Sequence, residues 1–342
     1  MKFAFTGDIH LSRYGQDKLE DESNLPERLH SIKNALYEIA DYCVANDIRV
    51  IVIGGDLLHG KSVIYAIAQE IMIEYFETYQ YLIIFYVIDG NHDLSGKGET
   101  VVSALRPLGN INNVRWIRFD QTKHLEDDDI LFVPYSYDLP NVIKKNKAKI
   151  LISHFGLSEG MLNSGMSIVS DLSVKHLRNN YQLVLLGHYH KPQEIIEPGF
   201  SLYYVGSPIQ LDWGEKNDEK RFLVVDSDTM DVQSIPIQSY KKHIELELTP
   251  ESFDEVIELA RKAKESGDHV KVVMKEIVDL TSVKGEFNII DKTEQDITDR
   301  GITSSMSLQD KLQKYLEIRQ IAQEKQTAYI TAAQRSIEKC EV

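Results

Sequence analysis

Short apolar runs alternate with amphipathic segments in the first half of the chain, and each run ends in polar residues. Residues 2–7 read as a buried strand, residues 27–46 place apolar side chains on one helical face, and RVIVIGGD repeats the strand pattern. A second helix is expected over 62–79 and a third strand over 81–88. Two successive strand–helix–strand units predict a parallel sheet, whose ligand site lies beyond the carboxyl ends of its strands.

The pattern changes near residue 240 and divides the chain into parts. Further apolar strands are expected at 130–133, 149–153 and 182–186, and a β-rich stretch follows them. A strand–helix–strand unit comes next, then a polar stretch without clear period, and then a helical segment with apolar stripes. We therefore expect an α/β fold with a first domain over 1–240, a small α/β cap over 241–285, a linker over 286–306 and a helical tail over 307–342.

Five of the expected strand ends carry side chains that bind divalent metals. Carboxylate, amide and imidazole groups together favour Mn²⁺, Fe²⁺ or Zn²⁺, and no cysteine is near them. Two such ions can clamp the attacking and leaving oxygens of a phosphoryl displacement. We expect the D-x-H and H-x-H spacings to place both side chains on one side of an extended loop, and the preceding glycines to allow tight turns. The candidates are Asp8, His10, Asp56, Asn91, His92, His154, His188 and His190.

The cysteine content and the net charge indicate the cellular compartment and the kind of partner. The two cysteines, Cys43 and Cys340, form no metal or disulfide pattern, which favours a reducing cytoplasm. No signal peptide fits the first residues, and no apolar run reaches membrane-spanning length. A net charge of -15 argues against a self-sufficient nucleic-acid binder. Bound metal ions or a basic partner subunit would supply the missing positive charge.

The order of the motifs GDIH, GGD, GNHD, SHF and GHYH resembles the calcineurin-like metallophosphoesterase superfamily over about residues 1–240. GGDLLHG at 54–60, GSPIQLDWGE at 206–215 and the layout of cap, linker and tail are similar to the SbcD-type DNA repair and recombination nucleases. The resemblance implies a β-sandwich flanked by helices, with a cap that helps to hold DNA. It also implies an SbcC-type coiled-coil ATPase partner that binds the C-terminal helices, and a homodimer.

The resemblance also implies roles for individual residues. Asp56 would bridge two divalent ions, with Mn²⁺ the expected metal. His92 would be the catalytic histidine, which either stabilises the phosphate or protonates the departing 3′ oxygen. Asp93 would orient His92, and His59 would steer the DNA strand. One metal would be held by Asp8, His10, Asp56 and His190, and the other by Asp56, Asn91, His154 and His188.

The expected activity is metal-dependent exonuclease and endonuclease cleavage of DNA ends, gated by the ATPase partner. The short chain resembles the recombination endonuclease subunits of large bacteriophages, so a bacterial cytoplasm is the expected location. Two alternatives stay open. One is a related phosphoesterase acting on a nucleotide, phosphoprotein or lipid head group; the other is a non-catalytic scaffold subunit, although such folds lose ligands and this chain keeps all seven.

Overall fold

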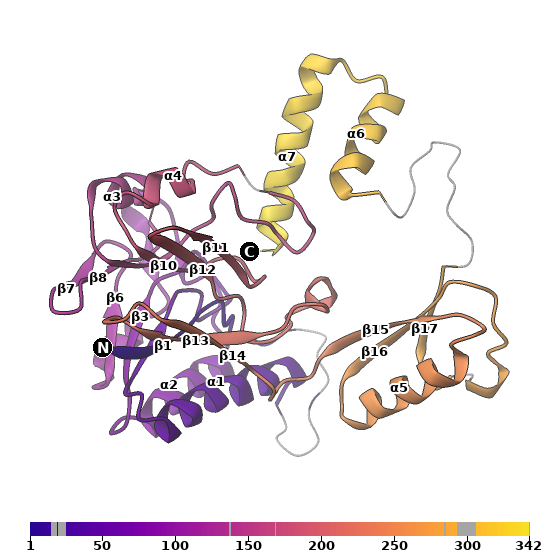
Figure 1. Ribbon diagram of the computed structural model, residues 1–342, viewed down its shortest axis with the longest axis horizontal. Helices are drawn as coiled ribbons and strands as arrows, with labels where there is room; N and C mark the ends of the chain where they lie inside the picture. Colours follow the sequence, from indigo (N-terminus) through magenta and orange to yellow (C-terminus); the bar gives the residue numbers. More distant parts are fainter. Residues whose placement is uncertain are drawn as a thin grey trace.

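Two facing six-stranded sheets form the centre of the computed structural model, which describes residues 1–14, 19, 25–136, 138–167, 169–283, 285–292 and 306–341 (Figure 1). The first sheet has the order β14-β13-β1-β2-β3-β6, and its strands β1, β2, β3 and β6 run parallel. These strands span Lys2–Thr6 (β1), Val50–Ile53 (β2), Ile84–Ile88 (β3), Val114–Ile117 (β6), Arg221–Asp226 (β13) and Val232–Pro236 (β14).

The second sheet has the order β11-β12-β10-β9-β8-β7, with β8, β9, β10 and β12 parallel. Apolar side chains of both sheets meet between the layers, among them Phe3, Phe5, Phe132 and Leu185. This burial explains why the strands read as continuous apolar runs. The strands are Lys123–Leu125 (β7), Ile130–Val133 (β8), Ile150–His154 (β9), Leu183–Gly187 (β10), Gln193–Glu197 (β11) and Phe200–Tyr204 (β12); a small hairpin pairs Leu94–Ser95 (β4) with Val102–Ser103 (β5).

Helices cover the outer faces of the sandwich. The helices Glu27–Ala45 (α1) and Ala66–Thr78 (α2) pack on the first sheet, and Leu139–Lys145 (α3) and Val174–Leu177 (α4) pack on the second. The predicted start of the third strand is wrong by three residues. The backbone N–H groups of Leu82 and Ile83 donate to the carbonyl of Tyr79, so that segment forms the turn after α2.

The cap is a separate three-stranded parallel sheet with one helix. His243–Leu248 (β15), Phe253–Glu265 (α5) and His269–Met274 (β16) form the predicted strand–helix–strand unit, and Asn288–Asp291 (β17) pairs with β16. The strand β17 lies in the segment 286–306 that the sequence pattern predicts as a linker. Its few apolar residues gave too short a pattern to recognise.

Two helices, Leu308–Ile318 (α6) and Gln323–Glu341 (α7), lie in the expected tail (Figure 1). They contact each other through Gln313 Nε2, which donates to Gln326 Oε1 at 3.0 Å. None of the helices that the structure describes is both long and apolar enough to cross a membrane. The predicted α/β sandwich with a small cap and a helical tail is confirmed.

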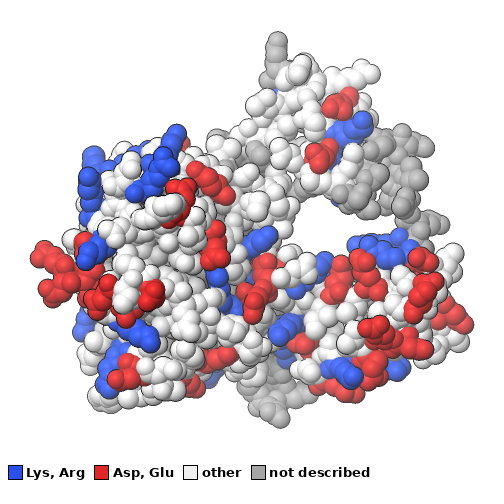
Figure 2. Space-filling view, viewed as in Figure 1, with Lys and Arg blue, Asp and Glu red and all other residues white. Residues whose placement is uncertain are grey.

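Charged side chains are unevenly distributed on the face seen in Figure 2. Acidic side chains gather over the cap around α5 and at the edge of the sandwich formed by β7 and β8. Lysines and arginines form several separate groups, one of them near α3, rather than one broad field. The visible surface is therefore not the continuous basic face expected of a protein that binds nucleic acid by surface charge alone.

Candidate metal centre

The loops that follow β1 and β2 run side by side and carry three of the candidate ligands. Asp8 N donates to Gly55 O at 3.1 Å, and His10 N donates to Asp56 O at 2.9 Å, so the strand pairing continues into the loops. The backbone is not extended there. Asp8, His10 and Asp56 have φ of 50°, 53° and 52°, and His188 has φ 96°. The expected alternation of an extended D-x-H loop is therefore wrong, because the ligand-bearing residues themselves adopt the left-handed conformation, which costs about 1–3 kcal/mol each.

Three glycines are required mainly by close approach. A Cβ on Gly90 would lie 2.1 Å from Asp56 Oδ1, and one on Gly187 would lie 2.5 Å from Gly54 O and 2.8 Å from His154 Nδ1. Gly55 would meet His154 Nδ1 at 2.4 Å and also has φ of +95°. The expectation that the glycines serve tight turns holds for Gly55. At Gly90 and Gly187 the missing side chain makes room for the ligands instead.

The first group of candidate ligands comes from the ends of β1, β2 and β10. His10 Nε2 lies 2.9 Å from His190 Nε2 and 3.7 Å from Asp56 Oδ2. His190 Nδ1 donates to Glu215 Oε1 at 3.0 Å, so the neutral ring presents the lone pair of Nε2 to the site. Asp8 lies in the same cluster, with its potential ligand oxygen within 4.8 Å of the ligand nitrogens of His10 and His190.

The second group is built from the ends of β3, β9 and β10. Asn91 Oδ1 lies 3.0 Å from His154 Nε2 and 3.0 Å from His188 Nδ1. His154 Nε2 is also 3.3 Å from Asp56 Oδ2, and its Nδ1 donates to Gly54 O at 2.8 Å, which fixes the ring. The structure therefore brings together all seven side chains that the motifs predicted as ligands.

Asp56 provides the test of whether these residues fit a metal pair. Its Oδ1 accepts the N–H of His92 at 2.7 Å, whereas its fully buried Oδ2 has no hydrogen-bond partner. That oxygen faces imidazole nitrogens of both groups, from His10 and His154. A buried carboxylate oxygen without a donor is costly unless a cation lies beside it. The donor set and its geometry therefore fit divalent metals bridged by Asp56.

The charges within the site are set by burial and by proximity. Burial disfavours the imidazolium of His154, but the carboxylates of Asp56 and Asp8 outweigh it and raise its pKa to about 9. Burial lowers the pKa of His188 to about 3 and that of His10 well below its usual range. Burial also opposes charge on Asp56, yet the imidazoles, with His154 first, hold its pKa well below the ordinary value. In the empty site Asp56 is thus ionised and His10 and His188 are neutral, which are the forms that bind metals, whereas His154 carries a proton that a bound cation would displace.

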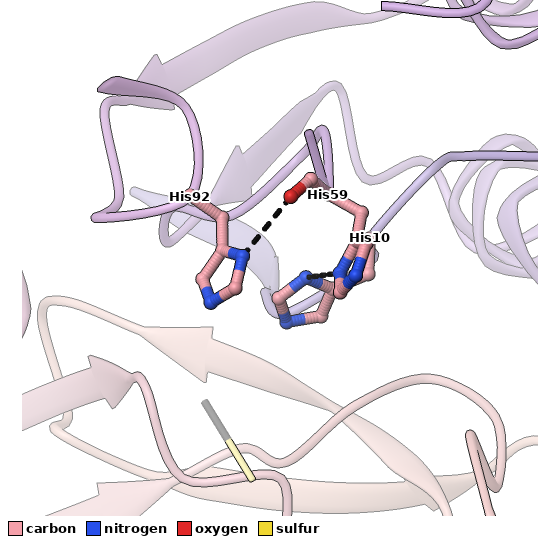
Figure 3. A group of neighbouring side chains, drawn as sticks. All are labelled: His10, His59 and His92. Atoms are coloured by element: carbon pink, nitrogen blue, oxygen red, sulfur yellow. Dashed lines mark hydrogen bonds between the residues drawn. The ribbon is translucent and has the colours of Figure 1, made fainter. Parts of the chain in front are cut away.

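The predicted role of Asp93 is not what the structure shows. Its carboxylate accepts the backbone N–H of Leu58 at 2.9 Å and of Gly90 at 2.8 Å, and so ties two ligand loops together. The ring of His92 is instead held by the backbone carbonyl of His59, 3.0 Å from its Nδ1 (Figure 3). Asp93 therefore holds the backbone of two loops in place rather than the His92 ring. The GNHD motif alone does not show which hydrogen bonds its aspartate makes.

His10, His59 and His92 form a cluster beside the ligands (Figure 3). The rings of His59 and His92 are stacked with centroids 5.1 Å apart, and His59 Nδ1 lies 3.2 Å from His10 Nδ1. His92 Nε2 is buried and has no hydrogen-bond partner. The ring is thus fixed at one nitrogen, and the other is available to a group that enters the site.

Two residues that support His190, Glu215 and Lys220, were not predicted from the sequence. Glu215 is the last residue of the GSPIQLDWGE stretch, whereas Lys220 belongs to no motif. Lys220 is fully buried, and its Nζ donates to Glu215 Oε2 at 2.6 Å, to Ser207 Oγ at 2.9 Å and to His190 O at 3.0 Å. Burial opposes charge on Glu215, but Lys220 and His190 outweigh it and lower its pKa to about 2. This ionised carboxylate orients the His190 ring.

The chain is similar to several known proteins. Exonuclease subunit 1 of Enterobacteria phage T4 is 26% identical over 245 residues, which cover 69% of this chain and 68% of that protein. The DNA double-strand break repair protein Mre11 of Archaeoglobus fulgidus is 22% identical over 244 residues, 65% of this chain and 53% of that one. A protein of invertebrate iridescent virus 6, provisionally named phosphoesterase 244L, is 23% identical over 234 residues, 66% of this chain and 77% of that one.

These relatives are distant, and the chain spans only about half of the archaeal protein. The family is established separately. The family model for calcineurin-like phosphoesterases matches residues 1–192, which contain all seven candidate ligands and more than half of the chain. This chain is therefore a member of the calcineurin-like phosphoesterase family.

Proposed function

We propose that this protein is a metal-dependent phosphodiesterase that cleaves DNA, the nuclease subunit of a repair or recombination complex. The observation that carries the proposal is that the seven candidate ligands lie in two adjoining groups, with Asp56 Oδ2 facing both, and that neither this buried oxygen nor the nearby His92 Nε2 has a hydrogen-bond partner. The similarity to a phage exonuclease subunit and to a DNA double-strand break repair protein supports DNA as substrate.

The ligands would divide between two metals, with Mn²⁺ the ion that we propose. Asp8, His10, Asp56 and His190 would hold one, and Asp56, Asn91, His154 and His188 the other. The distances from Asp56 Oδ2 to His10 Nε2 and to His154 Nε2, 3.7 and 3.3 Å, support a bridging role for this oxygen. When bound, such a pair neutralises phosphate charge and acidifies water.

His92 would act on the leaving group. Because its Nδ1 donates to the His59 carbonyl, the neutral ring carries a lone pair on Nε2, and the protonated ring can donate from Nε2. An oxygen leaving phosphorus next to this atom would therefore receive a proton from a ring already held in place. His59 stacks on His92 and would guide the strand at the rim of the site.

The remaining parts of the chain would serve the partners. The cap, residues 241–291, would help to hold DNA, and α6 and α7 would dock on an SbcC-type coiled-coil ATPase. Exposed apolar side chains on these helices, Tyr315, Ile318 and Tyr329, support a docking surface. We further propose a homodimer and a bacterial or phage-infected host cell.

The test is a cleavage assay on linear double- and single-stranded DNA with Mn²⁺, beside a small chromogenic diester, bis(4-nitrophenyl) phosphate. Wild-type protein should cleave all three, and chelation should abolish cleavage. His92→Ala should reduce DNA cleavage by about 10²–10⁴-fold, the range of general acid catalysis, while metal content persists. His124→Ala is the control, because this exposed histidine pairs with Asp129 away from the site.

Two results would contradict the proposal. Hydrolysis of the small diester without DNA cleavage would keep a phosphodiesterase but discard the DNA substrate. Full DNA cleavage by His92→Ala would remove His92 from the mechanism.

A further inference from the structure

A column of planar groups leads from His92 out of the metal site. His59 stacks on His92, the ring of Tyr14 lies 5.3 Å from that of His59, and the guanidinium of Arg28 lies 4.2 Å above the Tyr14 ring. Tyr14 is anchored because its hydroxyl donates to the carbonyl of His10 at 2.8 Å. The metal site, His92 and Arg28 are thus connected by a series of neighbouring rings, of which His59 and His92 are stacked and Tyr14 is tilted against His59.

A cavity of about 280 Å³ runs along this column, with Tyr14, Arg28, His59 and His190 among its lining residues. Its other wall includes Asn163, which is held in place by a 2.7 Å hydrogen bond from its Nδ2 to Asp218 Oδ2. The cavity therefore has both a candidate metal ligand, His190, and Arg28 in its lining. It offers an incoming group both flat aromatic faces and polar side chains.

A second cavity of about 480 Å³ begins at Arg28 and extends between α1 and the cap. His243 lines it and is nine-tenths buried, and its Nδ1 has no hydrogen-bond partner. The His243 ring stacks on His269 with centroids 4.9 Å apart and meets Trp213 edge to face at 4.8 Å. Like the first cavity, this one presents aromatic faces, and it adds a buried polar atom without a hydrogen-bond partner.

The charges that line the second cavity are mixed. Its lining contains three cationic residues, Arg28, Lys241 and Lys264, and two acidic ones, Glu27 and Asp268. Lys241 Nζ pairs with Glu27 Oε1 at 2.8 Å. A compact ligand with several negative charges would be repelled by the carboxylates of Glu27 and Asp268. A single strand of nucleic acid suits the lining better, because its bases stack on aromatic rings and its phosphates are spaced along the chain.

We propose that the two cavities form one track for a single strand of nucleic acid flanking the scissile phosphate, and that Arg28 binds a backbone phosphate where they meet. This inference rests on the proposed function, since it needs a polynucleotide substrate. Arg28 is the residue that lines both cavities and stands over an aromatic ring, and guanidinium groups bind phosphate in charge-assisted pairs. A small diester at the metal site would not extend to Arg28, so Arg28 would determine preference for longer substrates.

The first arm of the test measures binding without cleavage. A fluorescent single-stranded oligonucleotide of about twelve nucleotides, within the range of strand-binding sites, is titrated with full-length protein under chelation and read by anisotropy. Arg28→Ala should weaken binding about tenfold and reduce the slope of log K against log salt by about 0.7, the loss of one phosphate contact on a single strand. Arg28→Lys should restore part of the slope.

The matched control is Arg115→Ala. This arginine lies on β6, where its Nη1 donates to the Asn112 carbonyl, and it lines neither cavity. Its variant should bind the oligonucleotide like wild type. If Arg28→Ala also binds like wild type with an unchanged salt slope, or if the wild type does not bind the oligonucleotide, the track is overturned.

The second arm separates this inference from the proposed function. The kcat/KM for oligonucleotide cleavage is divided by that for bis(4-nitrophenyl) phosphate, and this ratio should fall about tenfold in Arg28→Ala and persist in Arg115→Ala. An equal fall for both substrates would mean that Arg28 supports the metal site rather than the strand. If the wild type hydrolyses neither substrate, the proposed function fails, and the binding arm alone decides the track.

Discussion

At the scale of single residues, the site depends on buried polar atoms that have no hydrogen-bond partner and on glycines at positions where a side chain would not fit. Asp56 uses Oδ1 for the N–H of His92 and keeps Oδ2 bare in the buried interior. Residue 90 is a glycine next to this carboxylate, and a side chain there would collide with Asp56. Each feature costs free energy in the empty protein, and bound cations would offset that cost.

The first prediction concerns Gly90→Ala. The new Cβ would lie 2.1 Å from Asp56 Oδ1 and 2.3 Å from its backbone N, so the bridging carboxylate must move. Calorimetric titration with Mn²⁺ should show metal affinity reduced by at least about tenfold, in the range seen when ligand support is lost. Gly109→Ala is the control, since its Cβ would meet only Trp116 at 3.7 Å. Wild-type affinity in Gly90→Ala would contradict the packing argument.

The second prediction concerns Glu215→Gln. The amide would keep the shape but not the charge that His190 Nδ1 and Lys220 Nζ require. Metal affinity should fall about 10–100-fold, as for other partners behind a ligating histidine, and thermal stability should fall because Lys220 loses its closest buried counter-ion. The exposed Glu197→Gln, paired only loosely with Arg178 at 3.7 Å, should change neither. Unchanged metal affinity in Glu215→Gln would show that His190 needs no carboxylate behind it.

At the scale of elements, the parallel strands bring distant motifs to one edge of the sandwich. The ends of β1, β2 and β3 in one sheet meet those of β9 and β10 in the other, which is why ligands from residue 8 to residue 190 can touch. The cap joins this body next to Arg28, through the pair of His243 and His269. The junction is therefore both a structural contact and a wall of the proposed track.

The third prediction concerns this junction. Burial, and then the charge of nearby His269, lower the pKa of His243 to about 4. Because the folded-state pKa lies below the ordinary 6.5, the unfolded chain binds the proton first, and stability should fall as the pH drops from about 6.5 toward 4. The thermal midpoint should be lower at pH 5 than at pH 7.5, and His243→Gln should reduce that difference. The exposed His124→Gln should leave it as in wild type; an unchanged pH difference in His243→Gln would contradict the assignment.

The sequence pattern predicted most of the elements and the candidate ligands, but not the contacts that connect them. Short apolar runs ending in Asp, Asn or His marked β1, β2 and β3 and the side chains that converge beyond them. The uses of Asp93 and Lys220 depend on hydrogen bonds between loops that only the fold brings together. A local pattern carries no information about such partners. The strand β17 was missed for another reason, since four residues with two isoleucines are too short a signal.

At the scale of the whole molecule, charge and shape suggest a subunit that works with others. The chain carries a net charge of -15, and acidic side chains gather over the cap on the visible face (Figure 2). Long-range attraction to DNA would therefore be weak, and a basic partner would have to supply it. In our proposal the tail would bind such a partner, and Tyr315 and Tyr329, 39% and 51% exposed on α6 and α7, would contribute apolar surface.

The fourth prediction separates the tail from the chemistry. Truncation after residue 306 removes α6 and α7 but none of the candidate ligands. Hydrolysis of bis(4-nitrophenyl) phosphate with Mn²⁺ should stay within about twofold of wild type, because surface elements remote from a site rarely change it. Recovery of a co-expressed coiled-coil ATPase encoded near this protein should be lost. Unchanged recovery would show that the tail is not the docking segment.

The central claim is that Asp56 bridges two cations, and anomalous X-ray scattering from crystals grown with Mn²⁺ tests it most directly. Two peaks are expected about 3.5–4 Å apart on either side of Asp56 Oδ2. One should lie against Asp8, His10 and His190, and the other against Asn91, His154 and His188. A single peak that does not contact Asp56, or the absence of any peak at these seven residues in metal-saturated crystals, would contradict the account.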